Sequence, residues 1–287
     1  MESIKLKIND YLKSYFKKDV SFNRNLYDAM AYSINLGGKR IRPILMLLTY
    51  SIYNNNYEKI MPMAAAIEMI HTYSLIHDDL PCMDDDDLRR GKPTNHKVFG
   101  EALAVLAGDA LLNEAMNIMF DFCIKEDKNS LRACRIISQA AGAEGMIGGQ
   151  VVDMLSEGKS ISTEELLYMH SKKTGELIKA SILAGAVMGG ASNEEEMLLN
   201  NFGEKLGLAF QIKDDILDVT SSKDVLGKTV NADVNNNKTN FISTYGLEKC
   251  KELCVSLTNE CINTLSAIDK DTAELKRLTE FLLKREF

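Results

Sequence analysis

Proline is confined to the first third of the chain. The four prolines stand at positions 43, 62, 81 and 93, and none occurs between Thr94 and Phe287. Proline breaks helix interiors, and β-rich proteins need frequent proline and glycine in their turns. The distribution therefore predicts an all-α fold, and apolar residues do recur with helical spacing along most of the chain. Helices are expected near residues 23–36, 43–53, 60–79, 99–125, 130–155, 163–189, 194–219, 239–267 and 271–285, after a first one with the apolar stripe Ile4, Ile8, Tyr11, Leu12 and Tyr15.

The chain has 287 residues and no proline- or serine-rich linker, so one domain, 1–287, is expected. Hydrophobic residues make up 45% of it, which excludes general disorder, and a net charge of −7 gives no support for nucleic-acid binding. Glu2 and Asp10 interrupt the start, so we expect no secretory signal. The longest uncharged apolar stretch, 180–191, is shorter than the roughly 20 residues that cross a bilayer. These features predict a cytoplasmic protein with no stable membrane insertion.

Six cysteines are present without a CxxC pair, and Cys250, Cys254 and Cys261 share one helical face. A metal site there would lack histidine ligands. Buried, reduced thiols are therefore the favoured interpretation, which also agrees with a cytoplasmic protein.

The first of two aspartate clusters reads DDLPCMDDDD over residues 78–87. Pro81 disfavours helix just before it, so we expect Asp78 and Asp79 on the last turn of a helix and residues 84–87 on the following loop. Carboxylates spaced so closely repel one another unless a cation lies among them. An isolated acidic run would usually be solvated surface, but this run is not isolated.

The second cluster, QIKDDILD at 211–218, lies within an apolar helical segment and places Asp214 and Asp218 on one helix face. Two clusters that offer only oxygen ligands suit a hard cation such as Mg²⁺, which proteins commonly hold with a few carboxylates plus substrate phosphates. No EF-hand calcium loop is present. Without the nine clustered aspartates the net charge would change from −7 to +2, so the acidity is a local excess at the predicted metal motifs.

Basic residues gather in two short motifs that suit an anionic ligand. GGKRIRP at 37–43 is a glycine turn whose proline can open a helix, and LRRG at 88–91 follows the first acidic cluster. Arginine binds phosphate oxygens in pairs, whereas lysine contacts them as a point charge. Beside two Mg²⁺-type clusters, these motifs favour binding of a phosphate-bearing ligand. The basic side chains concerned are Lys39, Arg40, Arg42, Arg89 and Arg90.

One histidine, His71, lies two turns before Asp78 and forms the only E-x-x-H of the chain with Glu68. A di-iron carboxylate bundle needs two such motifs, so that alternative is weak.

Together these motifs resemble those of the trans-isoprenyl diphosphate synthases. HTYSLIHDDLPCMDDDDLRRGKPTNHKVFGEALAVLAGDALL (71–112) is similar to the first aspartate-rich motif of that family and its surroundings, in the DDxxxxD form typical of bacterial short-chain enzymes. GLAFQIKDDILD (207–218) is similar to the second motif, and GGKRIRP and HSKKTGELIKAS (170–181) match two more. The resemblance covers nearly the whole chain and implies an all-helical bundle around a large central cavity, a homodimer, and metal-dependent condensation of isopentenyl diphosphate with an allylic diphosphate.

The resemblance also implies roles for individual residues. Several Mg²⁺ ions would be bound by Asp78, Asp84 and Asp214, with Asp79 and Asp218 close by. Isopentenyl diphosphate would be bound by Lys39, Arg42, His71 and Arg90, and the allylic diphosphate would contact Arg89. The region where positive charge develops would be lined by Lys173, Thr174 and Gln211. Further diphosphate contacts would come from Lys228 and Lys238, on or just after a closing loop at 220–237.

Product length in such an enzyme depends on the helix turn below the first motif. Tyr73 and Ser74 lie about 6–7.5 Å below Asp78 along that helix. The resemblance suggests that Tyr73 is the floor of a pocket that stops at C15, although one more core aromatic residue explains the pattern equally well. We therefore expect a farnesyl diphosphate synthase, with two alternatives: a geranylgeranyl (C20) synthase, or a non-catalytic subunit of a heteromeric synthase, which would typically lack one aspartate motif. A terpene cyclase is disfavoured by DDILD at 214–218.

Overall fold

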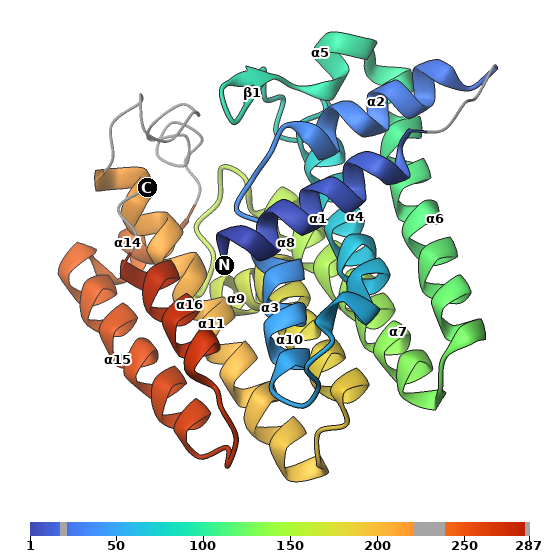
Figure 1. The fold of residues 1–287 in the computed structure, drawn as a ribbon. Helices are drawn as coiled ribbons and strands as arrows, with labels where there is room; N and C mark the ends of the chain where they lie inside the picture. Colours follow the sequence, from blue (N-terminus) through green and yellow to red (C-terminus); the bar gives the residue numbers. More distant parts are fainter. Residues whose placement is uncertain (18–21, 221–238, 285–287) are drawn as a thin grey trace.

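Helices account for most of the described backbone, which in this computed structural model comprises residues 1–17, 22–220 and 239–284 (Figure 1). The first half contains α1 (Glu2–Tyr15), α2 (Arg24–Asn35), α3 (Ile41–Ser51), the 3-10 turn η1 (Tyr57–Ile60), α4 (Met61–Asp78), α5 (Asn95–Phe99), α6 (Glu101–Lys125) and α7 (Lys128–Ala141). The second half contains α8 (Met146–Ser156), α9 (Thr163–His170), the π-helical turn η2 (Ser171–Gly175), α10 (Glu176–Gly189), α11 (Asn193–Thr220), α14 (Phe241–Tyr245), α15 (Leu247–Ser266) and α16 (Ala273–Lys284). The all-α prediction is confirmed.

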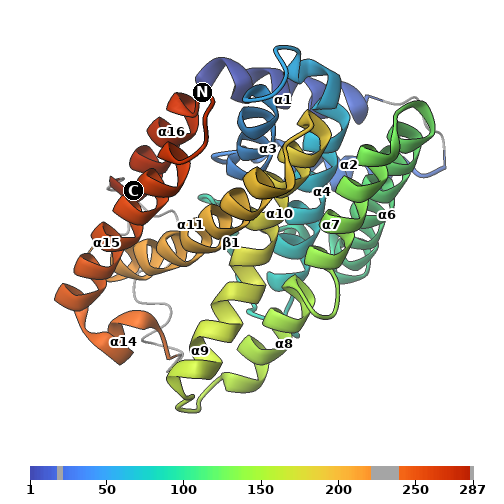
Figure 2. The same cartoon turned by 90° about the horizontal axis from the view of Figure 1, so that it is seen from below.

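Two central helices, α10 and α11, organise the bundle. Figure 2 shows them crossing the middle of the molecule, with α15 and α16 on one side and α6 and α7 on the other. Helix α10 packs against α3, α7 and α11, while α4 packs against α6 and α11 against α15. A short antiparallel hairpin of β1 (Leu88–Arg89) and β2 (Lys92–Pro93) lies with α5 at one end of the bundle (Figure 1).

Several helix boundaries have local causes. Asp127 caps α7 by accepting hydrogen bonds from the backbone amides of Asn129 and Ser130. Ser162 and Glu165 form a reciprocal capping box at the start of α9. The α10–α11 turn is closed by Gly190 in a left-handed conformation, which ends α10 at the predicted position.

Three predicted helices differ from the observed ones. The expected helix 239–267 is interrupted at Gly246, whose φ of +79° separates α14 from α15. The expected helix 130–155 is broken at residues 142–145, because the sequence GAEG supplies two glycines between α7 and α8. The expected helix 163–189 is continuous, but it passes through the π-helical turn η2. The expected loop 80–98 contains the β1–β2 hairpin and the start of α5, and the expected loop at 220–237 lies outside the described residues except for its first residue, Thr220.

The apolar stripe on α1 packs into the core through Ile8 and Leu12, both fully buried. The cysteines of α15 are buried as predicted, and each thiol donates to a backbone carbonyl: Cys250 to Phe241, Cys254 to Ala209 and Cys261 to Phe202. This pattern is that of packed thiols in a helical core.

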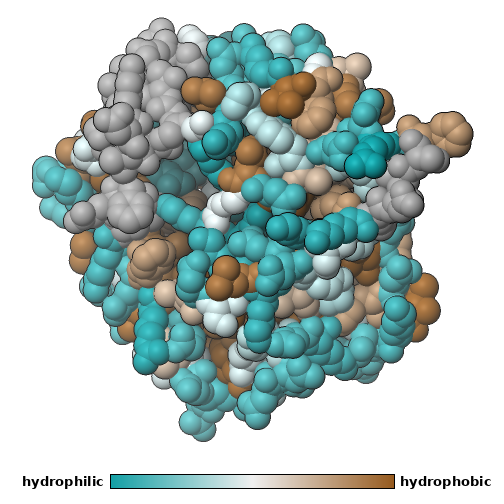
Figure 3. Space-filling model, turned by 45° about the horizontal axis from the view of Figure 1, so that its top comes forward, coloured by the Kyte–Doolittle hydropathy of each residue, from teal (hydrophilic) through white to brown (hydrophobic). Residues whose placement is uncertain are grey.

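One helix within the described residues, α6, has the length and apolar composition of a membrane span. It packs along α4 within the bundle, and 39% of its most apolar window is buried. Core helices of globular proteins have the same composition, so this feature is weak evidence for a membrane. Figure 3 shows a face of the molecule covered mainly by hydrophilic side chains, with hydrophobic ones scattered among them.

Candidate active site

A cavity of about 610 Å³ is enclosed chiefly by α4, α6, α8 and η2. Its wall combines charged and polar groups with a larger apolar surface. The polar lining includes Arg42, His71, Asp78, Gln150, Lys173 and Thr174. The apolar lining includes Leu75, Met83, Leu112, Met146, Ile147, Val151, Met154 and Leu155. A space of this kind suits a ligand with an ionic head and a hydrocarbon body.

The first aspartate motif is placed as the sequence predicts. Helix α4 ends at Asp78, and the loop folds back so that the Asp84 amide donates to the Asp78 carbonyl at 2.9 Å. Burial, against the opposing Lys173 ammonium and with help from the nearby carboxylate of Asp84, raises the pKa of Asp78 to about 6. The shift reflects chiefly the cost of burying the charged form of this carboxylate.

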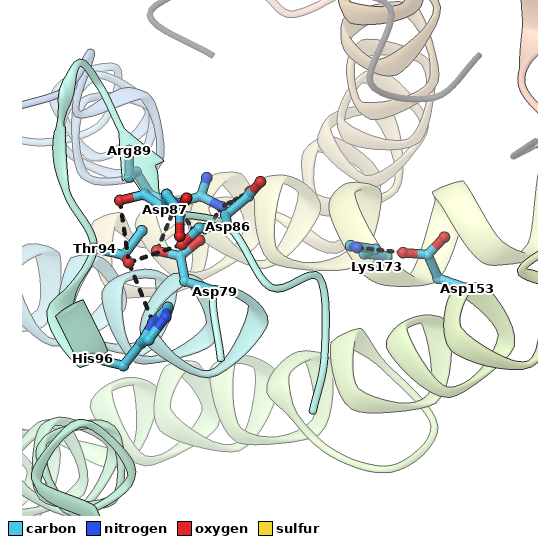
Figure 4. A network of polar contacts seen from close by, with 8 residues as sticks. All are labelled: Asp79, Asp86, Asp87, Arg89, Thr94, His96, Asp153 and Lys173. Atoms are coloured by element: carbon cyan, nitrogen blue, oxygen red, sulfur yellow. Dashed lines mark hydrogen bonds and ion pairs between the residues drawn. The ribbon is translucent and has the colours of Figure 1, made fainter. Parts of the chain in front are cut away.

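The neighbouring carboxylate, Asp79, points to a different partner. Its oxygens accept from Nε of Arg89 at 2.7 and 2.9 Å and from a terminal nitrogen of the same guanidinium. Both side chains are nearly buried, and Asp86 adds a longer contact of 3.4 Å to Arg89. Figure 4 shows this network lying apart from Lys173 and Asp153. Asp79 positions Arg89 in this structure, and its role as a metal ligand stays a prediction.

The glycine turn at 37–43 packs directly against Arg90. The Arg90 guanidinium donates to the Gly37 carbonyl, and a Cβ on Gly38 would lie 2.7 Å from that guanidinium. Gly38 also has a φ of +132°, which side chains with a Cβ rarely adopt. The two basic motifs, which are about 50 residues apart in sequence, therefore meet in space.

Arg40 differs from the other basic residues of the turn. It is 4% exposed, and it donates to Glu68 at 2.7 Å and to Asn9 at 2.8 Å. The prediction that Arg40 helps to hold an anionic ligand is therefore wrong, because its guanidinium forms a buried ion pair with Glu68. The same pair explains Glu68, whose E-x-x-H spacing with His71 reflects no metal site.

Arg42 and His71 both line the cavity, and the charged groups that act on His71 are guanidiniums. Burial lowers the pKa of Arg42 to about 10, so that it still carries its charge at neutral pH. Burial lowers the pKa of His71 well below its usual value, and the guanidinium of Arg42 lowers it further, with Arg90 adding to the effect. His71 is therefore a neutral imidazole that can donate one hydrogen bond. Lys39 is exposed on the glycine turn.

Helix α11 carries the second aspartate motif, and its aspartates have different surroundings. Asp214 is close enough to Arg42 to raise the pKa of that guanidinium, so the second aspartate motif approaches the glycine turn. Asp218 is half-buried one turn further on. Asp215 is 3% exposed and accepts from the backbone amide of Phe241 at 2.8 Å, which anchors α14. Asp215 is therefore a clustered aspartate whose hydrogen bond stabilises the fold.

Asp215 also orients one of the predicted catalytic residues. The Gln211 amide nitrogen donates to Asp215 at 3.0 Å, which directs the Gln211 carbonyl oxygen toward Thr174. The Thr174 hydroxyl donates to that oxygen at 3.0 Å. Thr174 and Gln211 are thereby brought together, as the sequence predicts, although they come from η2 and α11.

Lys173 lines the cavity from the π-helical turn and is bound by a residue that sequence reasoning missed. Its ammonium donates to Asp153 on α8 at 2.6 Å (Figure 4). Burial lowers the pKa of Lys173, but the carboxylates of Asp78 and Asp153 outweigh burial, and the net effect is a raised pKa. The signal for Asp153 was a lone aspartate inside the apolar run MIGGQVVDML at 146–155.

Close helix contact sets the position of this turn. A Cβ on Gly207 of α11 would lie 2.8 Å from the Cα of Gly175, the last residue of η2. Glycine at 207 therefore lets α11 approach the turn that carries Lys173 and Thr174, and so allows the hydrogen bond between Thr174 and Gln211.

The described residues contain no group of three metal-ligating side chains close enough to enclose an ion. The carboxylates instead come from separate elements: Asp78 on α4 lines the cavity, and Asp214 on α11 lies near Arg42 of the cavity wall. Such an oxygen-only set fits Mg²⁺ that completes its shell with substrate phosphates.

The predicted chain-length residues lie in the cavity wall. The Tyr73 ring is 6% exposed and packs edge-on against His77, with ring centres 5.8 Å apart. The Ser74 hydroxyl donates to the His71 carbonyl at 2.9 Å. Both residues line the cavity, whereas Lys228 and Lys238 lie outside the described residues.

Comparison with known proteins identifies this arrangement. The sequence profile of the polyprenyl synthetase family matches residues 23–281. The chain belongs to the polyprenyl synthetase family. It is a short-chain trans-prenyltransferase, as the sequence motifs predict.

Relatives of this prenyltransferase agree in fold and in sequence. Farnesyl diphosphate synthase of Geobacillus stearothermophilus is 46% identical over 263 residues, which cover 91% of this chain and 89% of the relative. The large subunit 1 of the heterodimeric geranylgeranyl pyrophosphate synthase of Arabidopsis thaliana is 44% identical, covering 91% and 72%. A solved Helicobacter pylori geranyltransferase, complexed with magnesium and isoprenyl diphosphate, is 35% identical with a TM-score of 0.84, covering 98% of this chain and 96% of the other.

Proposed function

We propose that this prenyltransferase condenses isopentenyl diphosphate with dimethylallyl or geranyl diphosphate, and that its main product is farnesyl diphosphate. The observation that carries the proposal is the cavity, because charged groups that suit two diphosphates share one space with an apolar wall that suits a prenyl chain. The identity to farnesyl diphosphate synthases supports the same substrates.

Mg²⁺ is the proposed cofactor, with Asp78, Asp84, Asp214 and Asp218 as its protein ligands. The buried Asp78, whose pKa is raised to about 6, favours a cation beside it. Bound Mg²⁺ would neutralise negative charge on the leaving diphosphate. The magnesium complex of the Helicobacter pylori geranyltransferase supports this assignment.

The chain's own residues would bind both substrates and stabilise the reacting carbons. Arg42, Arg90 and Lys39 would hold isopentenyl diphosphate, and neutral His71 would donate a hydrogen bond to it. When the allylic C1–O bond breaks, the Gln211 carbonyl oxygen and the Thr174 hydroxyl oxygen would face the carbon that gains positive charge. The isopentenyl double bond then attacks that carbon, and the departed diphosphate takes the proton.

Product length is the finer part of the proposal. Tyr73 is buried in the cavity wall, where its ring would stop a growing chain. Geranylgeranyl synthases are 41–44% identical to the chain, so a C20 product is the second candidate. A non-catalytic subunit is the third, although both aspartate motifs are intact.

We further propose a cytoplasmic homodimer formed through α6. Leu106, Phe120 and Ile124 on α6 are more than half exposed. Apolar side chains exposed in such number favour a protein interface, and in a dimer they would also explain the apolar character of α6. A solution mass of one chain, 32.0 kDa, would contradict the dimer.

The test is Mg²⁺-dependent release of diphosphate from dimethylallyl or geranyl diphosphate together with isopentenyl diphosphate. The wild type should release diphosphate, and Asp78→Ala and Asp214→Ala should each lower turnover by at least about a hundredfold while keeping the helical circular-dichroism spectrum. Near-normal turnover in either folded variant would contradict the assignment. No release with any allylic primer would favour the non-catalytic subunit.

A further inference from the structure

Two cysteines lie together outside the proposed active site, where α6 turns into α7. The Sγ atoms of Cys123 on α6 and Cys134 on α7 are 3.1 Å apart. This separation is about 1 Å longer than a disulfide bond. Only residues 126 and 127 connect the two helices, so the sulfurs face each other across a short helical hairpin. We propose that Cys123 and Cys134 form a reversible disulfide when the protein meets a peroxide.

The two thiols have different environments and therefore different roles in the reaction. Cys123 is partly exposed, so an oxidant can reach it, whereas Cys134 is 7% exposed. Burial raises the pKa of Cys134 well above its usual range, and its hydrogen bond with Cys123 raises it further. Cys134 therefore stays a thiol, and Cys123 is the group that meets the oxidant first.

The reaction balances with the peroxide as the only oxidant. The Cys123 thiolate attacks one peroxide oxygen, the O–O bond breaks, and hydroxide leaves to give a sulfenic acid. The Cys134 sulfur then attacks the Cys123 sulfur, the S–O bond breaks, and the oxygen departs as water with the Cys134 proton. The two thiols lose two electrons, the peroxide is reduced to two waters, and a dithiol reductant reverses the change.

The remaining cysteines are arranged differently. Cys250, Cys254 and Cys261 are buried on α15, where each thiol donates to a backbone carbonyl. Cys82 is exposed on the loop of the first aspartate motif and serves as a control for non-specific oxidation. Neither Cys123 nor Cys134 lines the cavity, so a disulfide between them is independent of the proposed function.

The test treats the full-length protein with hydrogen peroxide, blocks remaining thiols under denaturing conditions, and maps tryptic peptides by mass spectrometry. Cleavage after lysine and arginine places Cys123 in peptide 98–125 and Cys134 in peptide 133–135. We expect these two peptides joined, two hydrogens lighter than their sum, and separated again by dithiothreitol. Free, alkylated Cys123 and Cys134 after oxidation, or Cys123 joined to another cysteine, would overturn the proposal.

Variants provide a second, independent readout. The link closes a short loop, so oxidation should raise the Tm of the wild type and of Cys82→Ser by roughly 5–10 °C. Cys123→Ser, at the half-exposed position, and Cys134→Ala, which keeps a small apolar group, should both lose this rise. A rise that persists in either folded variant would show that another bond is responsible and would overturn the proposal.

Discussion

Lys173 is a single residue whose charged group is held in place by the fold. Its ammonium is bound to Asp153 at 2.6 Å and is also attracted by Asp78, which lines the same cavity. Asp153 thus acts as a positioning residue, because it fixes the direction of the Lys173 side chain from outside the predicted metal motifs.

We expect Asp153→Asn to lower kcat about tenfold to a hundredfold, because Lys173 loses its anchor near the reacting groups. The change should also move the alkaline limb of the pH–rate profile to lower pH, since the Asp153 carboxylate helps to raise the pKa of Lys173. Steady-state kinetics across pH would measure both effects. Asp121→Asn, at an exposed position on α6, is the matched control and should change neither. An unaltered pH profile in Asp153→Asn would contradict the positioning role.

Single residues also mark the limit of sequence reasoning. Asp78 and Asp79 are adjacent, as are Asp214 and Asp215, yet successive side chains on a helix point about 100° apart. Asp78 therefore lines the cavity while Asp79 binds Arg89, and Asp215 anchors α14. Asp153 was missed because its partner is 20 residues away and meets it only after α8 and η2 pack together.

At the scale of elements, the π-helical turn η2 carries Lys173 and Thr174 and is held against α11 by the Gly175–Gly207 contact. The periodicity of apolar residues predicted a helix here but not its π form, because one extra residue in a single turn leaves the surrounding pattern almost unchanged.

Gly207→Ala tests this contact. Its Cβ would lie 2.8 Å from the Gly175 Cα and should push α11 away, which lengthens the hydrogen bond between Thr174 and Gln211. We expect a loss of about 1–3 kcal/mol in the free energy of unfolding and a fall of at least about tenfold in kcat. Urea denaturation and steady-state assays would measure the two.

Gly175→Ala is the matched control, because its Cβ would make only an ordinary contact of 3.6 Å with the His170 carbonyl. It should retain most of the wild-type activity and stability. Equal kinetics for Gly207→Ala and wild type would show that the close approach has no catalytic importance.

For the whole molecule, buried neutral histidines make stability depend on pH. Burial lowers the pKa of His170 to about 4, although the Asp153 carboxylate opposes the shift. Below its ordinary pKa of about 6.5 the unfolded chain binds a proton that the folded protein does not, so stability is full above that value and falls toward about pH 4.

Between about pH 7 and about pH 5, we expect the free energy of unfolding to fall by about 2 kcal/mol less in His170→Gln than in the wild type. Urea denaturation at the two pH values measures this difference, which is independent of the lost ring stacking between His170 and Phe241. Equal losses for the two proteins would contradict the buried, neutral state of His170.

More of the fold than of the site was predictable from the sequence. The absence of proline after residue 93 and the helical periodicity predicted the all-α bundle. The first aspartate motif and GGKRIRP predicted Asp78 and Arg42, which both line the cavity. The cavity's depth was not predictable, because it depends on how α4, α6, α8 and η2 pack around Tyr73. Arg40 was misassigned for a similar reason, since only the fold brings Glu68 to it.

The mass of the product made from geranyl and isopentenyl diphosphates with Mg²⁺ tests the central claim most directly. We predict farnesyl diphosphate (C15) as the main product, and a shift to C20 or longer in Tyr73→Ala, because the smaller side chain opens the cavity floor. A wild type that makes no prenyl product, or mainly C20, would contradict the proposed function.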